Sequence, residues 1–343
     1  MAANNTTLDS PNRSSCDVFV NQQATEILFP VFYSLVFLIS VCGNTLVLLV
    51  ICQRREKFNS TAVYLLNLAL SDILLTLALP GRIIYYILDF NWPFGDFLCR
   101  MSALLFFANT YAGIGFMTCM SLDRYLAVVH PQRMLCLRQV KVVRWICCLV
   151  WAVVSVQVAP LLFYNKLQHH GDRWTCMEYI DVDGSQWKPH FILLGCVVSF
   201  CCPLVAILVS YARIHTKLRV AAGRNSTSPS KRNHRANAII LLILLTFIAC
   251  FCPYHLSVIQ FMCRKMHHEV SCEEQTDFRV YSQITVLLMN FNCCLDPVLY
   301  FFAIRTYKKR VMNLFRERLC GSTPTSTTLA LAKTTTENSS SDS

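Results

Sequence analysis

Two carboxylates lie inside stretches of the sequence that are otherwise apolar. Asp72 occurs among leucines and alanines, Asp296 precedes Pro297 in a second apolar stretch, and Asn44 adds an amide to a third. Because ionisable groups are costly in apolar surroundings, each one is a candidate functional residue. We expect the two carboxylates to hold a cation or to take up protons. The alternative is a hydrogen-bonded network that only stabilises the fold.

A charged tripeptide, Asp123-Arg124-Tyr125, follows a long apolar stretch. Any helix that leaves an apolar layer is expected to have a charged end, so the tripeptide alone is weak evidence for a function. An arginine at such an end can alternate between its neighbouring aspartate and partners on another helix or on a docking protein. We therefore treat Arg124 as a candidate switch residue.

Three prolines interrupt apolar stretches that otherwise favour helices, and these are Pro203, Pro253 and Pro297. Proline lacks a backbone N–H and clashes with the preceding turn, so each one predicts a bend. A bend inside a packed bundle is a candidate hinge for a conformational switch.

The composition of the chain indicates the surroundings in which these residues are held. Of its 343 residues, 54% are hydrophobic and only 15% are charged, and the mean hydropathy is +0.42. Soluble domains carry about 25% charged residues, so this chain has too few charged residues for a protein that is surrounded by water. A membrane is the expected surrounding.

Seven stretches are apolar over the roughly 20 residues that a helix needs to cross the hydrocarbon layer. They span residues 27–52, 61–88, 97–129, 144–164, 190–216, 237–261 and 280–304. A soluble core would accommodate one or two such helices but not seven. The sequence predicts an all-α membrane protein with a seven-transmembrane helix bundle over residues 27–304 and a short amphipathic helix over residues 305–320.

Lys and Arg residues are concentrated in the loops on one side of this predicted bundle, for example Arg54, Arg55 and Lys57. Cytoplasmic loops are enriched in these residues. We therefore expect a multi-pass protein of the plasma membrane with its N-terminus outside and its C-terminus inside. The net charge of +11 is explained by this bias, so nucleic-acid binding has no separate support.

The segments that flank the bundle carry candidate modification sites. Residues 1–26 are polar, have no pattern of a cleavable signal peptide, and hold glycosylation sequons at Asn4, Asn5 and Asn12. Cys320 ends the basic amphipathic stretch at the inner membrane surface, where we consider it a palmitoylation site. Residues 321–343 are rich in Ser and Thr and are expected to form a disordered cytoplasmic tail that accepts phosphate.

Most of the nineteen cysteines fall within the predicted helices, where they are expected to pack as small apolar residues. Four others lie on the predicted oxidising side: Cys16, Cys99, Cys176 and Cys272. Four cysteines allow three pairings, and spacing does not choose between them. A bond between Cys99 and Cys176 would hold the second outer loop over the bundle, and one between Cys16 and Cys272 would tie the N-terminal segment to the third outer loop.

Taken together, these residues resemble the rhodopsin-like (class A) G-protein-coupled receptors. The resemblance covers about residues 27–319 and rests on an ordered set of motifs in the matching helices. The set comprises Gly43-Asn44, Leu68-Ala-Leu-Ser-Asp72, Asp123-Arg124-Tyr125, Trp151, Pro203 with Tyr211, Phe247-Ile-Ala-Cys-Phe-Cys-Pro253-Tyr254, and Asp296-Pro297-Val-Leu-Tyr300.

The resemblance implies roles for several of these residues. The residue at Arg124 engages the G protein in this family, and tyrosines that match Tyr211 and Tyr300 swing inward to support it. The other positions that match coupling or switch residues are Asp123, Tyr125, Ile114, Pro203, Phe247, Phe251, Pro253, Asp296 and Pro297. Heterotrimeric G proteins, arrestin and receptor kinases are the implied partners within the lipid bilayer.

Asp72 resembles the acid of the family's sodium site, but two neighbours depart from the usual pattern. Gly113 stands where a serine ligand is usual, and Asp296 replaces the commoner asparagine, so sodium binding at Asp72 is left open. Phe251 replaces the usual tryptophan. Phe251 together with Asp296-Pro297 resembles the purinergic and lipid branch of class A, in which a second outer disulfide, here Cys16–Cys272, is common.

The residues at positions that contact ligands in this family argue against two ligand classes. Phe106 stands where amine receptors carry an aspartate, which argues against an amine. Nucleotide receptors need several cations around the phosphates. His255 matches one such position, but Val258 and Val286 stand at two others, so Arg82 would hold a polyanion almost alone.

Arg82 lies near the outer end of the second predicted helix. It either extends to the membrane interface or faces inward as one strong donor in an apolar site. Tyr111 and Tyr254 would add hydroxyls to that site, and apolar walls would come from Phe106, Phe107 and Leu288. One charge, a few hydroxyls and much hydrocarbon suit a hydroxylated lipid or a lipid with one acid group.

Within class A, four stretches resemble the receptors that sense dihydroxy-sterols and guide lymphocyte migration. They are Leu79-Pro-Gly-Arg-Ile-Ile-Tyr-Tyr86, Asn109-Thr-Tyr-Ala-Gly113, Thr175-Cys-Met-Glu-Tyr179 and Leu288-Met-Asn-Phe-Asn-Cys-Cys294. The resemblance implies an oxysterol agonist that contacts Arg82, Tyr111 and Tyr254, and coupling to Gi/o proteins. One tyrosine of that site is replaced by Phe107, so the preferred hydroxylation pattern is left open.

Two alternatives remain at this point. One is a class A receptor for a nucleotide or an acidic lipid. The other is a transporter or a membrane enzyme, but the two halves of the chain share no repeat, and the helices hold no metal-type cluster of His and Glu. We therefore expect no enzymatic activity, no catalytic residues and no cofactor.

Overall fold

The computed structural model describes residues 22–53, 59–132, 134–163, 167–170, 172–177, 188–224, 231–268, 270–304 and 307–313. The predictions for Asn4, Asn5, Asn12, Cys16 and Cys320 fall outside these residues. Within them, residues 307–313 are helical and belong to the stretch for which an amphipathic helix is predicted.

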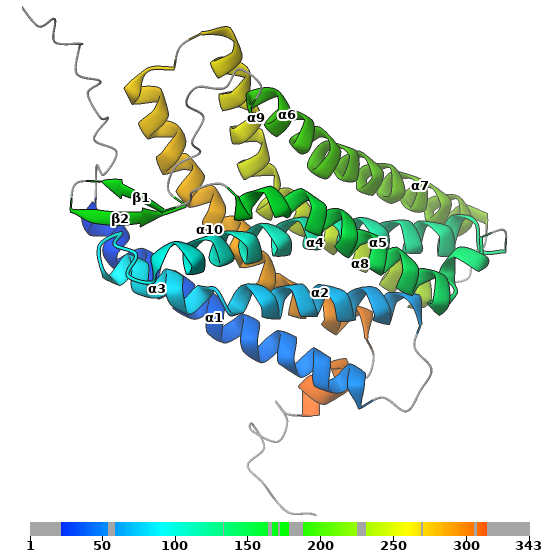
Figure 1. Ribbon diagram of the computed structural model, residues 1–343. Coiled ribbons are helices and arrows are strands. Elements are labelled where there is room, and N and C mark those ends of the chain that lie inside the picture. The colour runs from blue at the N-terminus through cyan, green and yellow to red at the C-terminus, as the bar shows by residue number, and fades with distance from the viewer. Residues whose placement is uncertain are drawn as a thin grey trace, which may run out of the picture.

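The described residues form long helices that pack side by side, with one small hairpin at an end of the bundle (Figure 1). The helices are α1 Gln22–Cys52, α2 Ser60–Thr76, α3 Leu79–Ile87, α4 Gly95–Val129, α5 Val140–Val158, α6 Lys188–Cys196, α7 Cys202–Arg224, α8 Lys231–Cys250, α9 Cys252–His267 and α10 Cys272–Ala303. Shorter helical turns are η1 Cys136–Arg138, η2 Ala159–Leu162 and the π-helical η3 Val197–Cys201. The nearly all-α architecture confirms the predicted fold class.

Six helical stretches are long and apolar enough to cross a membrane, and a seventh is made of two helices that meet at a bend. The six are Ile27–Cys52, Ser60–Ile87, Gly95–Val129, Val140–Leu162, Pro189–Val220 and Cys272–Ala303. The bent pair is Ala238–Cys250 with Cys252–His267. Each coincides with one of the seven apolar stretches of the sequence, with ends that differ by several residues.

Polar side chains fix where two of these helices begin. The Asn59 side chain accepts a hydrogen bond from the N–H of Ala62, at 2.9 Å, which caps α2. At the start of α10, Ser271 and Glu274 form a capping box in which each side chain accepts from the other's backbone N–H.

Two of the three prolines coincide with breaks in helical geometry. α8 and α9 meet at Phe251 with a bend of 42°, two residues before Pro253. The π-helical turn η3 ends two residues before Pro203. α10 in contrast runs without a break through Pro297, which packs against α1.

A further break divides the second apolar stretch, for which the sequence predicts one continuous helix. α2 ends at Thr76 and α3 begins at Leu79. Pro80 explains the break, because it has no N–H for the carbonyl of Thr76, four residues earlier, and its ring clashes with that carbonyl. The helix after the break, α3, carries Arg82.

The hairpin is a second feature that hydropathy does not predict. Strand β1, Leu167–His170, pairs antiparallel with β2, Arg173–Cys176, and Leu167 lies opposite Cys176. The Trp92 N–H donates to the carbonyl of Trp174 at 2.7 Å, which joins the hairpin to the segment between α3 and α4. We refer to this end of the bundle as the hairpin end, and to the opposite end as the Asp123 end.

We expect Gly43→Ala to destabilise the protein by about 1–3 kcal/mol, because it overpacks a rigid contact. A Cβ atom on Gly43 would lie 2.4 Å from Cγ of Pro297, and a proline ring has little freedom to move away. The measurement is the melting temperature of the purified protein in detergent. Gly195→Ala is the matched control, because a Cβ there meets nothing within 4 Å and alanine favours a helix. Equal melting temperatures for the two variants would contradict the prediction.

Candidate functional site

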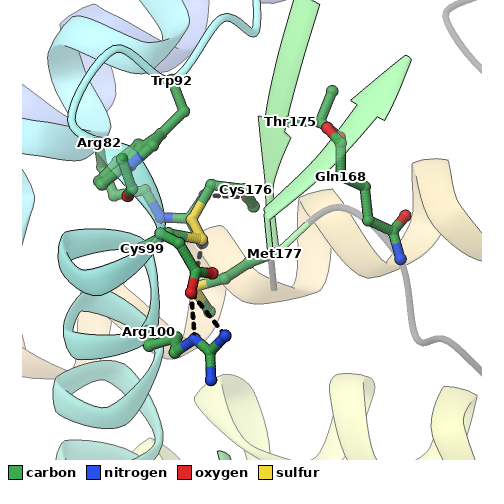
Figure 2. The surroundings of a disulfide bond; sticks show 10 residues. Arg82, Trp92, Cys99, Arg100, Gln168, Thr175, Cys176 and Met177 are labelled. Carbon is green, nitrogen blue, oxygen red and sulfur yellow. Dashed lines mark hydrogen bonds and ion pairs between the residues drawn. A yellow bond between two sulfur atoms is a disulfide. The ribbon is translucent and has the colours of Figure 1, made fainter. Parts of the chain in front are cut away.

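At the hairpin end, Arg82 of α3 reaches the residues at the end of β2. Its Nη1 donates to the carbonyl of Cys176 at 3.3 Å, and its Nη2 donates to Sδ of Met177 at 2.8 Å. The guanidinium carbon also lies 5.8 Å from the ring centroid of Tyr85. Figure 2 shows Arg82 beside the strand end and its disulfide. The half-buried guanidinium therefore contacts the loop that covers the bundle.

A disulfide between Cys99 and Cys176 holds this loop in place (Figure 2). Cys99 lies in the first turns of α4, so the bond fixes the end of β2 to the bundle. This is one of the two pairings considered from the sequence. Cys272 is also disulfide-bonded. Cys16, the partner proposed for it from the sequence, lies outside the described residues.

Aromatic side chains on α4 follow one another along the helix below this loop. The rings of Phe106 and Phe107 lie 5.0 Å apart, and those of Phe107 and Tyr111 lie 6.3 Å apart in a stacked arrangement. Phe106 is 8% exposed, and Phe107 and Tyr111 are half-buried. Three of the predicted ligand-binding residues thus form one row on one helix.

α9 and η3 complete this group of rings around His255. The His255 ring lies 6.3 Å from Tyr111, 5.4 Å from Tyr254 and 4.5 Å from Phe200, the last in a parallel stack. The structure therefore brings Tyr111 and Tyr254 to the same buried histidine. His255 Nδ1 bonds to the carbonyl of Phe251 at 2.8 Å.

Two predicted ligand-binding residues do not belong to this group of rings: Arg82, which contacts the end of β2, and Leu288. The Leu288 side chain is 39% exposed and lies on the same face of α10 as Ile284 and Phe291, which are also exposed. These three residues recur at helical spacing, so they form a stripe that faces lipid. The role of Leu288 in ligand binding stays a prediction.

From His255 the rings continue into the core of the bundle. Phe200 stacks on Phe247 at 5.7 Å, and Phe247 contacts Phe251 at 5.5 Å. Phe200, Phe247 and Phe251 are at most 1% exposed. We call the series Phe107, Tyr111, His255, Phe200, Phe247 and Phe251 the aromatic column. It joins the hairpin end to the bend between α8 and α9.

Beneath the aromatic column lies a fully buried polar cluster built on the two carboxylates. Asn109 donates to Asp72 Oδ1 at 2.9 Å, and Tyr300 donates to Asn44 Oδ1 at 3.0 Å and to Asp72 Oδ2 at 3.5 Å. Asn292 donates to Asp296 Oδ2 at 3.0 Å, and the carboxyl groups of Asp72 and Asp296 lie within hydrogen-bonding reach of each other. The residues on α1, α2, α4 and α10 thus form one connected network.

This cluster contains oxygen atoms that suit either a shared proton or a small hard cation. Among the described residues, Asn292 Oδ1 and Asp296 Oδ1 are buried without a hydrogen-bond donor. Two adjacent carboxylates need a proton or a counter-ion between them, and carboxylate and amide oxygens are ligands for hard cations. Gly113 contributes no hydroxyl, and its Cα faces Phe251 and Asn292.

At the other end of the bundle, Asp123 binds three partners and is only 4% exposed. Its carboxylate lies 3.3 Å from Nη2 of Arg124 and 3.1 Å from Nε of Arg138, and it accepts from the hydroxyl of Thr61 at 3.4 Å. Arg138 ends η1, in the loop between α4 and α5. Arg124, whose side chain is 21% exposed, is thus held beside Asp123.

The three tyrosines predicted to act in switching contact other groups in this structure. Tyr125 hydrogen-bonds to Nε2 of His130 at 3.2 Å, and Tyr211 stacks on His215 with a centroid distance of 5.9 Å. Tyr300 bonds to Asn44 and Asp72, as described above. Each of these three contacts is made with a residue other than Arg124.

Sequence reasoning missed Asn109, Phe200, Met177 and Arg138 in these sites. Asn109 had a detectable signal, because it is an amide within an apolar stretch, as Asn44 is. Phe200 is one of many phenylalanines in apolar stretches, and Arg138 is one of many cations in the basic loops. Met177 lies in one of the four stretches quoted above for their resemblance, but its residue type does not mark it as a contact of Arg82.

Comparison with known proteins gives a family and several relatives. Residues 43–300 match the family model "7 transmembrane receptor (rhodopsin family)". The chain is 42% identical to G-protein coupled receptor 183 of Homo sapiens over 322 residues, which cover 92% of this chain and 89% of that protein. For the Rattus norvegicus protein of the same name, the identity is 43%, with 93% and 90% covered. The Homo sapiens uracil nucleotide/cysteinyl leukotriene receptor is 32% identical, with 86% and 77% covered.

Proposed function

This chain belongs to the rhodopsin family of seven-transmembrane receptors, and we propose that its ligand is a hydroxylated sterol such as a dihydroxycholesterol. As a class A G-protein-coupled receptor it is a multi-pass membrane protein with a ligand and a heterotrimeric G protein as partners, and not an enzyme. The proposal therefore concerns which ligand enters the bundle and which G protein responds.

One observation carries the proposal, namely that the Arg82 guanidinium bonds to Cys176, whose disulfide joins it to α4, the helix that carries the row of aromatic rings. Arg82 presents N–H donors at the end of β2, while Phe106, Phe107, Tyr111 and Tyr254 supply rings and two hydroxyls. A ligand with a large hydrocarbon body and a few hydroxyls matches this inventory. The four stretches that resemble the oxysterol-sensing receptors include Arg82 and Tyr111 and support the same ligand class.

The aromatic column supports a route from the ligand to the cytoplasm. A ligand that contacts Tyr111 and Tyr254 touches the same two rings that contact His255, and the column then leads to Phe247 and Phe251 at the bend. A sterol that binds the active conformation better than the inactive one would shift this bend. Arg124 would then leave Asp123 and engage a Gi/o protein, which in immune cells promotes migration.

The remaining assignments are part of the same proposal. The N-terminal residues 1–26 are extracellular and glycosylated at Asn4, Asn5 and Asn12, and residues 305–320 form helix 8 with palmitoylated Cys320. The tail over residues 321–343 is cytoplasmic and is phosphorylated by receptor kinases that recruit arrestin. The disulfide at the hairpin end supports this orientation, because disulfides persist on the oxidising, outer side of the membrane.

A receptor for a nucleotide or an acidic lipid is the second candidate. It is favoured by the 32% identity to a receptor named for uracil nucleotides and cysteinyl leukotrienes. A second observation in favour of an anionic ligand is Arg279, a cation of α10. It is only 7% exposed and lies two turns from the start of that helix. Two valines argue against a polyanion, because they stand at positions where nucleotide receptors carry cations. Val258 is buried and Val286 is half-buried.

The experiment is ligand-driven GTP exchange in membranes that contain the receptor and purified Gi. A dihydroxycholesterol, cholesterol, UDP, leukotriene D4 and a lysophosphatidic acid are added in parallel. We expect exchange to rise with the dihydroxycholesterol and to stay basal with cholesterol, which lacks the two added hydroxyls. Membranes without the receptor are the control.

Two results would contradict the proposal. Stimulation by UDP, leukotriene or lysophosphatidic acid alone would replace the sterol with the second candidate. Stimulation by the sterol with Gq or Gs, but not with Gi, would overturn the coupling while leaving the ligand class in place.

A further inference from the structure

Met177, the residue directly after the disulfide, has an unusual backbone conformation. Its φ is +66°, in the left-handed region that only a few other non-glycine residues of the described chain adopt. This region is unfavourable for residues with a Cβ. The preceding residue, Cys176, is held by its bond to Cys99, so the local structure keeps Met177 in this conformation. Figure 2 shows Met177 at the end of β2, next to the disulfide.

The strained backbone places the methionine sulfur against Arg82. The distance between Sδ and Nη2 of Arg82 is 2.8 Å, while Nη1 of the same guanidinium donates to the carbonyl of Cys176 at 3.3 Å. A thioether is a weak hydrogen-bond acceptor. A guanidinium forms stronger bonds with oxygen. One N–H group of the proposed ligand-binding cation is therefore directed at a poor acceptor that an oxygen could replace.

We propose that the Met177 thioether occupies the position of an agonist oxygen on Arg82, and that an agonist must displace it in order to bind. The inference rests on the proposed function, because it takes Arg82 as a ligand contact. Methionine has three rotatable bonds and adapts to irregular surroundings, so its side chain can leave while the disulfide keeps the backbone fixed. Met177 is then a specificity-determining residue, since a purely apolar ligand gains nothing from displacing it.

This role differs from that of a wall residue that only packs against the ligand. A wall residue contributes to affinity, so its removal lowers potency. A competing acceptor reduces affinity, so its removal raises potency. The sign of the change therefore separates the two roles.

The test uses Met177→Leu, which keeps a side chain of similar size but removes the acceptor. The half-maximal concentration of a dihydroxycholesterol is measured in the GTP-exchange assay, with surface expression checked by an epitope tag. Loss of the weak thioether hydrogen bond that competes with the ligand is expected to lower this concentration about threefold to tenfold. In an Arg82→Ala background, Met177→Leu is expected to change nothing, because the competition no longer exists.

Met266→Leu is the matched control, because Met266 is an exposed methionine of α9 at the hairpin end and should leave potency unchanged. If Met177→Leu does not reach the cell surface, Met177→Gly takes its place. Glycine accepts a positive φ without strain and also removes the sulfur, so potency should rise in the same direction.

The outcomes separate this inference from the proposed function. If no sterol stimulates the wild-type receptor, the proposed function fails and the inference fails with it. If a sterol stimulates the wild type and Arg82→Ala weakens that response, while Met177→Leu leaves potency unchanged or lowers it, only the inference is overturned.

Discussion

Arg82→Ala is expected to weaken the response to a dihydroxycholesterol by about tenfold to 150-fold, because a hydrogen bond to a charged group contributes about 1.5–3 kcal/mol. Arg82 is half-buried and reaches the strand end with two N–H groups, so it is placed to meet a polar ligand atom. The measurement is the half-maximal sterol concentration for GTP exchange at equal surface expression. Arg82→Lys should retain part of the response, because lysine keeps the charge but has no fork of two donors.

Arg264→Ala is the matched control for this experiment. Arg264 is also an arginine at the hairpin end, but it is 52% exposed and pairs with Glu274 on the surface. Exposed ion pairs contribute little, so a change of less than about twofold is expected. Equal potency of Arg82→Ala and wild type would support the other interpretation of Arg82, in which it only extends to the membrane interface.

Cys99→Ser or Cys176→Ser should remove most of the functional receptor from the cell surface. The two cysteines are 77 positions apart, and closing a loop of that length stabilises a fold by about 4–5 kcal/mol in the chain-entropy treatment. That is comparable with the entire stability of many domains. The bond also anchors the carbonyl of Cys176 that Arg82 contacts. Flow cytometry of tagged receptor, followed by GTP exchange on the remaining fraction, measures both effects.

Cys263→Ser is the appropriate comparison, because Cys263 is exposed and free in α9 near the same end of the bundle. It should express and respond as wild type does. If Cys176→Ser expressed normally and kept its potency, the loop would be held by its hydrogen bonds alone, such as the one between Trp92 and Trp174.

The fold was largely predictable because a membrane imposes a length on every helix. Each apolar stretch of about 20 residues corresponds to one span, and Asp72 and Asp296 were recognisable since charges are rare in such stretches. The end of α2 at Thr76 was harder to predict from the sequence, although Pro80 lies four residues further along. The hairpin could not be seen in hydropathy, because its strands are only four residues long.

The sites were predicted less completely, because they depend on contacts between distant residues. Leu288 shows that adjacent residues of one helix can differ completely in burial. One step along a helix turns a side chain by about 100°, so Leu288 faces outward while its neighbour Met289 is 2% exposed. Met177 and Arg138 matter only because of what they touch, and no local pattern indicates that Arg138 reaches a carboxylate on another element.

The three partners of Asp123 have a consequence for the energy of switching. If Asp123 had one cation, the departure of Arg124 would leave a buried carboxylate unpaired, and breaking such a pair costs about 3–5 kcal/mol. Here Arg138 stays at 3.1 Å and Thr61 keeps its hydroxyl bond, so the carboxylate loses one counter-charge and retains another. The site changes from a net charge of +1 to a neutral pair when Arg124 leaves. If Arg124 is released as predicted, Arg138 keeps the Asp123 carboxylate paired, which would lower the electrostatic free-energy cost of that release.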